Sequence, residues 1–179
     1  MKPKAFWSCA ACSLLLVTVA AGPACTSSCD KEDRTLVITS GRVTTTRVDG
    51  STTSSSVQEL LGAAGADSGA ESEAGVLLRV YESSPWGGPL ARFEGGNTLE
   101  FEHGLGVVPE WVSTYLSFAA EGTDKSNVAE NAGDSGLIEC VDAEIIRLRN
   151  NTCENEYSVR VLAQATQQGS QSSQPCRTE

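Results

Sequence analysis

Two strands and the corner that joins them are encoded by residues 97–118, NTLEFEHGLGVVPEWVSTYLSF. The first half alternates between apolar and acidic side chains, which predicts a strand with Leu99 and Phe101 facing a core. Glu100 then points toward solvent. Residues 111–118 alternate in the same way and predict a second strand. The segment therefore indicates a β-rich fold.

The corner itself is built from residues that permit a sharp change of direction. Gly104 and Gly106 allow backbone angles that side chains forbid, and Pro109 suits the entrance to an edge or loop. Leu105 is expected to plug the corner. His103, the one histidine of the chain, is interpreted as a half-buried residue whose ring nitrogen bonds a loop carbonyl, with a ligand contact as the alternative. A catalytic base is not expected, because no nucleophile motif with an orienting group accompanies it.

The rest of the chain continues the pattern of short strands and polar turns. Asp49-Gly50 between two β-branched runs is a strong hairpin signal. No amphipathic helix is predicted, and Val57 with Leu60 offers the anchors of at most one helical turn. We therefore expect an all-β chain that forms a single antiparallel β-sandwich. Strands are expected over residues 34–40, 42–48, 51–57, 76–82, 90–94, 98–103, 111–118, 137–141, 144–149 and 157–165.

Composition divides the chain into an ordered part and flanking segments. Residues 58–75 are rich in Ala, Gly and Ser and are expected to form a flexible loop, and residues 119–136 a long polar loop. The Gln/Ser-rich end has no apolar pattern and predicts a disordered tail. The expected organisation is a signal peptide over 1–24, a disordered lipidated tether over 25–33, the β-sandwich over 34–165 and the tail over 166–179.

The N-terminus has the features of an export signal. Lys2 and Lys4 precede an apolar run of about a dozen residues, which is shorter than the roughly 20 needed to span a bilayer. Cleavage after Ala24 exposes Cys25. The segment 21–25, AGPAC, resembles the signal of bacterial lipoproteins, in which small residues precede a lipid-carrying cysteine. The resemblance implies acylation of Cys25, for example with palmitate. Pro23 departs from the pattern, so a plain secreted protein is the alternative.

The cysteine count agrees with a lipid on Cys25. The chain has seven cysteines, of which two lie in the expected signal peptide. Acylation of a third leaves an even number, which can pair fully in an oxidising compartment. Three connectivities are possible. The favoured one joins Cys140 to Cys153, which flank a hairpin-like segment, and Cys29 to Cys176.

Charge and composition also exclude several classes of function. The net charge of −10 disfavours binding to nucleic acid. A single histidine and the lack of paired C-x-x-C motifs after the signal peptide disfavour a zinc site. No metal or cofactor is expected.

The corner carries a second resemblance. Residues 103–112, HGLGVVPEWV, resemble the His-x-Leu-Gly-x-x-Pro corner of C-terminal β-sandwich modules in phage tail-fibre proteins and, more weakly, the sandwiches of H-type lectins. The similar strand order extends over residues 98–165. The resemblance implies a β-sandwich, often a homotrimer, that recognises surface glycans or proteins. It carries over no ligand residue to this chain.

These observations lead to one main hypothesis and two alternatives. We expect a lipid-anchored cell-envelope protein, facing the periplasm or the exterior, that binds a glycan or an envelope protein without catalysis. The alternatives are a structural or accessory envelope component that assembles through strand edges, and a hydrolase with an unrecognised site. Trp86, Trp111 and Tyr115, with His103, are the candidate ligand residues, although packing against a loop also explains the aromatic ones.

Overall fold

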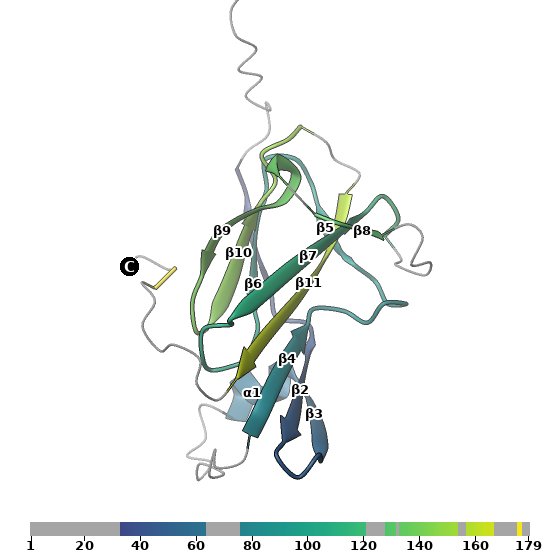
Figure 1. Cartoon of the computed structure of the whole chain (residues 1–179). Coiled ribbons are helices and arrows are strands. Elements are labelled where there is room, and N and C mark those ends of the chain that lie inside the picture. Colours follow the sequence, from purple (N-terminus) through teal and green to yellow (C-terminus); the bar gives the residue numbers. More distant parts are fainter. Residues whose placement is uncertain are drawn as a thin grey trace, which may run out of the picture.

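Two β-sheets packed face to face form the protein, which confirms the predicted all-β sandwich (Figure 1). The computed structural model describes residues 33–63, 76–120, 128–131, 133–153, 157–166 and 175–176. The expected signal peptide, nearly all of the tether and most of the tail lie outside these residues.

The smaller sheet has four strands in the order β1-β6-β10-β9. All its pairs are antiparallel except β1 with β6, which run parallel. The antiparallel prediction therefore has one exception, because the chain crosses to the other sheet between these two strands. The bounds are β1 Thr35–Ile38, β6 Thr98–Glu102, β9 Leu137–Val141 and β10 Ile145–Arg149.

The larger sheet has seven strands in the order β3-β2-β4-β11-β7-β8, and β5 pairs with β11 beside this path. Its longest strand, β11, runs through the middle of the molecule between β4 and β7 (Figure 1). The bounds are β2 Arg42–Arg47, β3 Thr52–Ser56, β4 Val76–Glu82, β5 Ala91–Phe93, β7 Trp111–Ser117, β8 Val128–Glu130 and β11 Tyr157–Thr166.

The core lies between the two sheets. Leu99 and Phe101 face it from the small sheet, as the alternation predicted, and both are fully buried. In β11 the alternate residues Val159 and Val161 face it from the large sheet and are fully buried as well. The period-two pattern thus assigns the core face of these two strands.

One acidic residue of the small sheet departs from the expected exposure. Glu100 lies on the outer face, yet it is only 6% exposed. Arg147, directly opposite on β10, covers it and donates to Glu100 Oε1 from Nη2 at 2.6 Å and from Nε at 3.0 Å. The expectation that this side chain points into solvent is therefore wrong, because a cross-strand arginine replaces water around the carboxylate.

Three short elements occupy segments that were expected to be loops, and one of them is the 3₁₀ helix η2, Asp134–Gly136. Helix α1 spans Val57–Ala63 and therefore exceeds the single turn that was expected. It starts with reciprocal bonds between Ser56 and Glu59, in which each backbone N–H donates to the side chain of the other residue. Strand β8 pairs with β7 within the predicted polar loop.

Candidate functional site

A loop of residues 83–90 folds over the outer face of the large sheet. It follows β4 and is held to β11 by two hydrogen bonds, from Ser83 N to Val161 O at 3.0 Å and from Val161 N to Ser83 Oγ at 2.9 Å. A turn in which Gly88 N donates to Pro85 O at 3.1 Å then reverses the chain. The loop thereby places Trp86 above the sheet.

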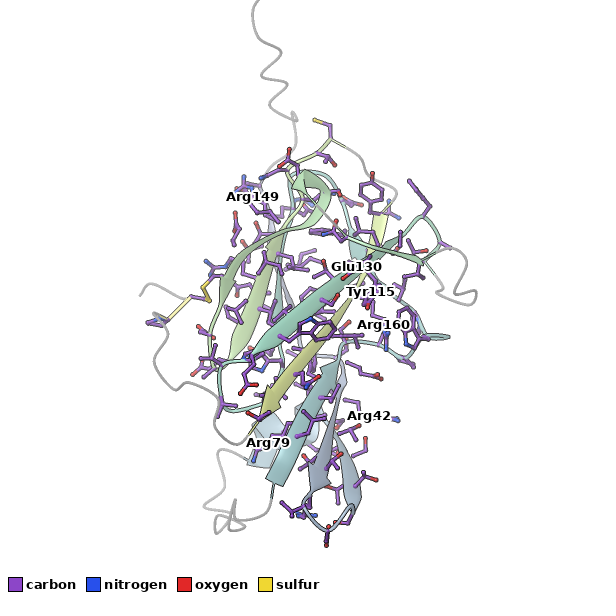
Figure 2. All side chains as sticks on the ribbon, viewed as in Figure 1. Arg42, Arg79, Tyr115, Glu130, Arg149 and Arg160 are labelled. Atoms are coloured by element: carbon purple, nitrogen blue, oxygen red, sulfur yellow. A yellow bond between two sulfur atoms is a disulfide. The ribbon has the colours of Figure 1, made fainter. Side chains whose placement is uncertain are left out.

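The Trp86 indole contacts side chains from two neighbouring strands. Its ring lies 5.0 Å from that of Tyr115 on β7, at an interplanar angle of 70°. The guanidinium carbon of Arg160 on β11 lies 3.8 Å from the Trp86 ring centroid. Tyr115 and Arg160 are direct partners in the β7–β11 ladder, and they lie together near the middle of the sheet (Figure 2). We call Trp86, Tyr115 and Arg160 the Trp–Arg–Tyr stack.

Arg160 is a fully buried cation on the face that strand alternation leaves open to solvent. Its Nε donates to the carbonyl oxygen of Ser84 at 2.6 Å, and its Nη2 lies 3.2 Å from Glu82 Oε1. Nη2 makes this ion pair without hydrogen-bond geometry, and neither Nη1 nor Nη2 has a hydrogen-bond partner among the described residues. Burial lowers the pKa of Arg160, while the charge of Glu82 acts in the opposite direction. The protein therefore holds an incompletely solvated cation under Trp86.

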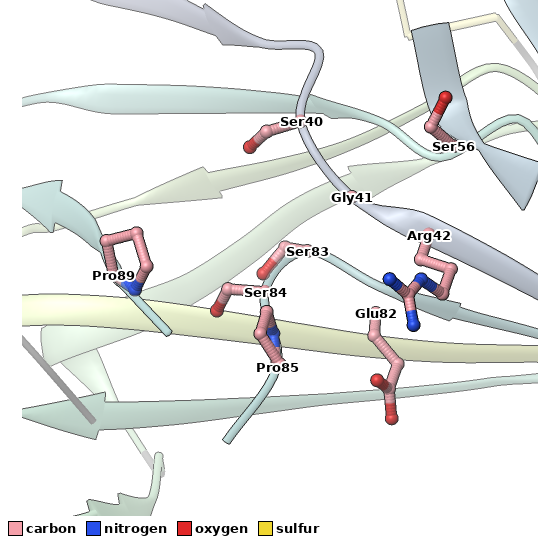
Figure 3. A pocket seen from close by; sticks show the side chains of 9 residues that line it. All are labelled: Ser40, Gly41, Arg42, Ser56, Glu82, Ser83, Ser84, Pro85 and Pro89. Atoms are coloured by element: carbon pink, nitrogen blue, oxygen red, sulfur yellow. The ribbon is translucent and has the colours of Figure 1, made fainter. Parts of the chain in front are cut away.

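A pocket of about 290 Å³ lies beside this loop (Figure 3). Its polar walls come from four serines and one pair of opposite charges, and Pro85 and Pro89 complete it. Arg42 on β2 stands directly opposite Glu82 on β4 in the ladder, and their side chains lie at the same end of the pocket. The polar lining residues are Ser40, Arg42, Ser56, Glu82, Ser83 and Ser84.

The candidate ligand residues divide into two groups. Trp86 and Tyr115 are brought together in the stack, and Trp111 lies on the same face of β7 as Tyr115, with 47% of its surface exposed. His103 is fully buried in another part of the fold. Arg42, Glu82 and Arg160 were not predicted as site residues. The one signal for Arg160 was a charge between the core valines at 159 and 161.

His103 completes a buried network at the corner. Leu105 N donates to its Nδ1 at 3.1 Å, which leaves the proton on Nε2, 3.1 Å from the carbonyl oxygen of Asp142. The contact with a loop carbonyl is as predicted, but the ring is fully rather than half buried. Burial lowers the pKa of His103, although the contacts with Asp142 oppose this shift. Both ring nitrogens are occupied, so the ring is held as a neutral part of the core.

The sharp turn of the chain at the corner depends on its two glycines. Gly104 and Gly106 have φ values of +63° and +73°, a region that residues with a Cβ rarely adopt. Leu105 between them is fully buried and acts as the expected plug. Arg79 of β4 donates to the Leu105 carbonyl at 2.8 Å and so ties the corner to the large sheet.

The disulfide pairing differs from the expected one. Cys140 is bonded to Cys176, with their Cα atoms 5.7 Å apart, so both favoured pairings, Cys140–Cys153 and Cys29–Cys176, are wrong. Cys153 is also disulfide-bonded, and its partner is neither of these two. Cys176 is brought to β9 by a hydrogen bond from its N–H to Asp142 Oδ2 at 2.7 Å. This tertiary contact, not proximity in sequence, selects the pair.

Within the part of the chain that the structure describes, no three His, Cys, Asp or Glu side chains gather as metal ligands would. None of the described helices combines the length and apolar composition needed to cross a bilayer. No family model, curated protein or solved structure matches the chain. The likeness to phage tail-fibre and lectin modules therefore stays a prediction, and the site is interpreted from its own geometry.

Proposed function

We propose that this chain is an exported, lipid-anchored protein of the bacterial cell envelope that binds a glycan through the outer face of its large sheet. The observation that carries the proposal is the Trp–Arg–Tyr stack. A loop crosses a solvent-facing sheet and fixes an aromatic ring there, on a buried cation. A buried arginine with unbonded nitrogens costs stability, which supports a role in positioning Trp86 for a ligand.

The stack supports glycan binding because it is both rigid and partly exposed. Stacking on Arg160 and the edge contact with Tyr115 fix the Trp86 ring before any ligand arrives, which lowers the entropy cost of binding. Trp86 itself is partly exposed, so a ligand can reach its ring. Aromatic rings with one solvent-exposed edge suit ligands that present both C–H and O–H groups.

The test is affinity electrophoresis of the full mature chain in gels that contain neutral or acidic polysaccharides. We expect at least one polysaccharide to retard the protein, and Trp86→Ala to weaken that binding about tenfold or more. Phe118→Ala is the matched control, because Phe118 is 71% exposed but belongs to a separate ring pair with Tyr157. The proposal would be refuted if the wild type and both variants were retarded equally, or if no polysaccharide retarded the wild type.

The lipid anchor is supported by the cysteine pairing. Cys140, Cys153 and Cys176 are all in disulfides, and Cys153 needs one further cysteine. If the signal peptide is removed, Cys25 and Cys29 remain, so one of them stays unpaired. Cys25→Ala should abolish labelling by radioactive palmitate and release the protein from membranes. Membrane retention of that variant would contradict the anchor.

The exposed strand edges support a second candidate function, assembly with further copies as in a homotrimer. Val57 N donates to Gly41 O, and from there every second residue of β3 forms backbone hydrogen bonds with β2. Thr52 and Ser54 are the residues in between, so their backbone groups point to the free edge of β3. This edge has no proline or charge to block pairing. If assembly uses it, Ser54→Pro should reduce the mass measured by sedimentation, whereas a monomeric wild type would exclude this function.

A further inference from the structure

The pocket beside the Trp–Arg–Tyr stack is lined mainly by hydrogen-bond donors. Ser83 Oγ accepts from Val161 N, so its hydroxyl still has its proton to donate. Ser84 Oγ is buried and has no partner among the described residues. These groups need oxygen acceptors, which a ligand in the pocket would supply.

The charges of the pocket favour an anion. Among the described lining residues Glu82 supplies the one carboxylate, and its Oε1 lies 3.2 Å from Nη2 of the buried Arg160. The side chain of Arg42 makes no hydrogen bond or ion pair with another described residue. Arg42 is the one cation among the described lining residues, and Glu82, which stands opposite it on β4, is shared with Arg160. A guanidinium beside hydroxyl donors suits a carboxylate ligand.

The size of the pocket limits the ligand to a small molecule. Its volume of about 290 Å³ lies at the lower end of the roughly 300–1,000 Å³ typical of small-ligand sites. Because a water molecule takes about 30 Å³ in the liquid, the space equals about ten waters, enough for a single sugar ring. Pro85 and Pro89 add apolar surface for C–H groups.

We infer that this pocket binds a small carboxylate that also carries hydroxyl groups, the chemistry of a uronic acid. The carboxylate contacts the Arg42 guanidinium and the Ser84 hydroxyl, and Ser83 donates to the ligand's other oxygens. Arg160 is a positioning residue, since it offsets the charge of Glu82 and fixes Ser84 through its carbonyl. The inference rests on the proposed glycan-binding function and names the sugar class that the same region selects.

The test is isothermal titration calorimetry of the full mature chain with galacturonate, with galactose as the uncharged control and glycine as a zwitterion. We expect galacturonate to bind at least tenfold more tightly than galactose. Arg42→Gln should remove that preference, and Ser84→Ala should weaken galacturonate about fivefold. Arg92→Gln is the matched control, because Arg92 is an exposed arginine that pairs with Glu94 away from the pocket. It should bind as the wild type does.

Several outcomes overturn the inference. Equal affinity for galacturonate and galactose would show that the pocket does not distinguish a charged ligand from a neutral one. Tighter binding of glycine than of galacturonate would show that the pocket prefers zwitterions. Unchanged galacturonate affinity in Arg42→Gln would place the anion elsewhere. If galacturonate fails while polysaccharide retardation is still lost in Trp86→Ala, the glycan-binding function stands and only the uronate inference falls.

Discussion

Asp142 offers the sharpest test of how the core and the C-terminal segment are held together. Its carboxylate is 7% exposed and accepts three backbone hydrogen bonds. Oδ1 accepts from Glu144 N at 2.8 Å and Ile145 N at 2.7 Å, and Oδ2 accepts from Cys176 N at 2.7 Å. The substitution Asp142→Asn keeps the shape but replaces one acceptor oxygen with an NH₂ donor. At least one backbone N–H therefore loses its partner.

The size of the effect follows from that lost acceptor. A hydrogen bond to a charged group contributes about 1.5–3 kcal/mol, and a buried N–H left unbonded costs about 1–3 kcal/mol. Because Asn retains one oxygen for the turn, only the bond to Cys176 is lost, and we expect a destabilisation of about 2–4 kcal/mol at neutral pH. In urea this corresponds to a midpoint lower by about 1–2 M.

The loss should depend on pH in a defined direction. Burial by itself raises the pKa of Asp142, but the N–H donors of Cys176, Ile145 and Glu144 outweigh it and hold the pKa below its usual value. The folded state thus favours the ionised form, so the carboxylate contributes stability above its unfolded pKa of about 4. That contribution is lost as pH falls through the folded pKa. The wild type and Asp142→Asn should therefore converge below about pH 4.

The assay is equilibrium urea unfolding followed by tryptophan fluorescence, at steps between pH 7 and pH 3. Glu144→Gln is the matched control, because it removes an exposed carboxylate two residues away and leaves the backbone bonds intact. It should unfold with the wild type. An Asp142→Asn midpoint equal to that of the wild type at pH 7, or a difference that persists unchanged to pH 3, would refute the reasoning.

Further predictions concern the disulfide, the corner and its histidine. Cys176→Ser should destabilise the fold by about 3–4 kcal/mol, since the Cys140–Cys176 bridge closes a loop with a sequence separation of 36, and peptide mapping without reductant should recover that pair. Leu105→Ala should cost about 2–5 kcal/mol in chemical unfolding, because a fully buried plug leaves a cavity; a loss below 1 kcal/mol would mean that the corner closes over it. The pKa of His103, measured by NMR, should lie below 6.5. The stability that its neutral form contributes should be complete above pH 6.5 and decline as pH falls toward the folded pKa. A pKa at or above 6.5 would contradict a neutral buried ring.

Local patterns account for most of the strands. Alternation placed Leu99, Phe101 and Val159 on the core face, since a side chain's face in a strand is set by its immediate neighbours. The glycines of the corner were informative for the same reason. Helix α1 was readable too, because Ser56 and Glu59 form the S-x-x-E capping signature. The glycines that follow, from Gly62 on, favoured a flexible loop instead.

Contacts between distant segments were decided only by the tertiary structure. Ser84 and Arg160 are 76 residues apart, and no local pattern states that a loop after β4 will cover β11. The Cys140–Cys176 bond likewise depends on Asp142, which draws the C-terminal segment to β9. Sequence alone determined which residues form most of the strands, because the period of two is a local property. Which side chains meet across the sheet depended on how those strands are ordered in space, and that order creates both the stack and the pocket.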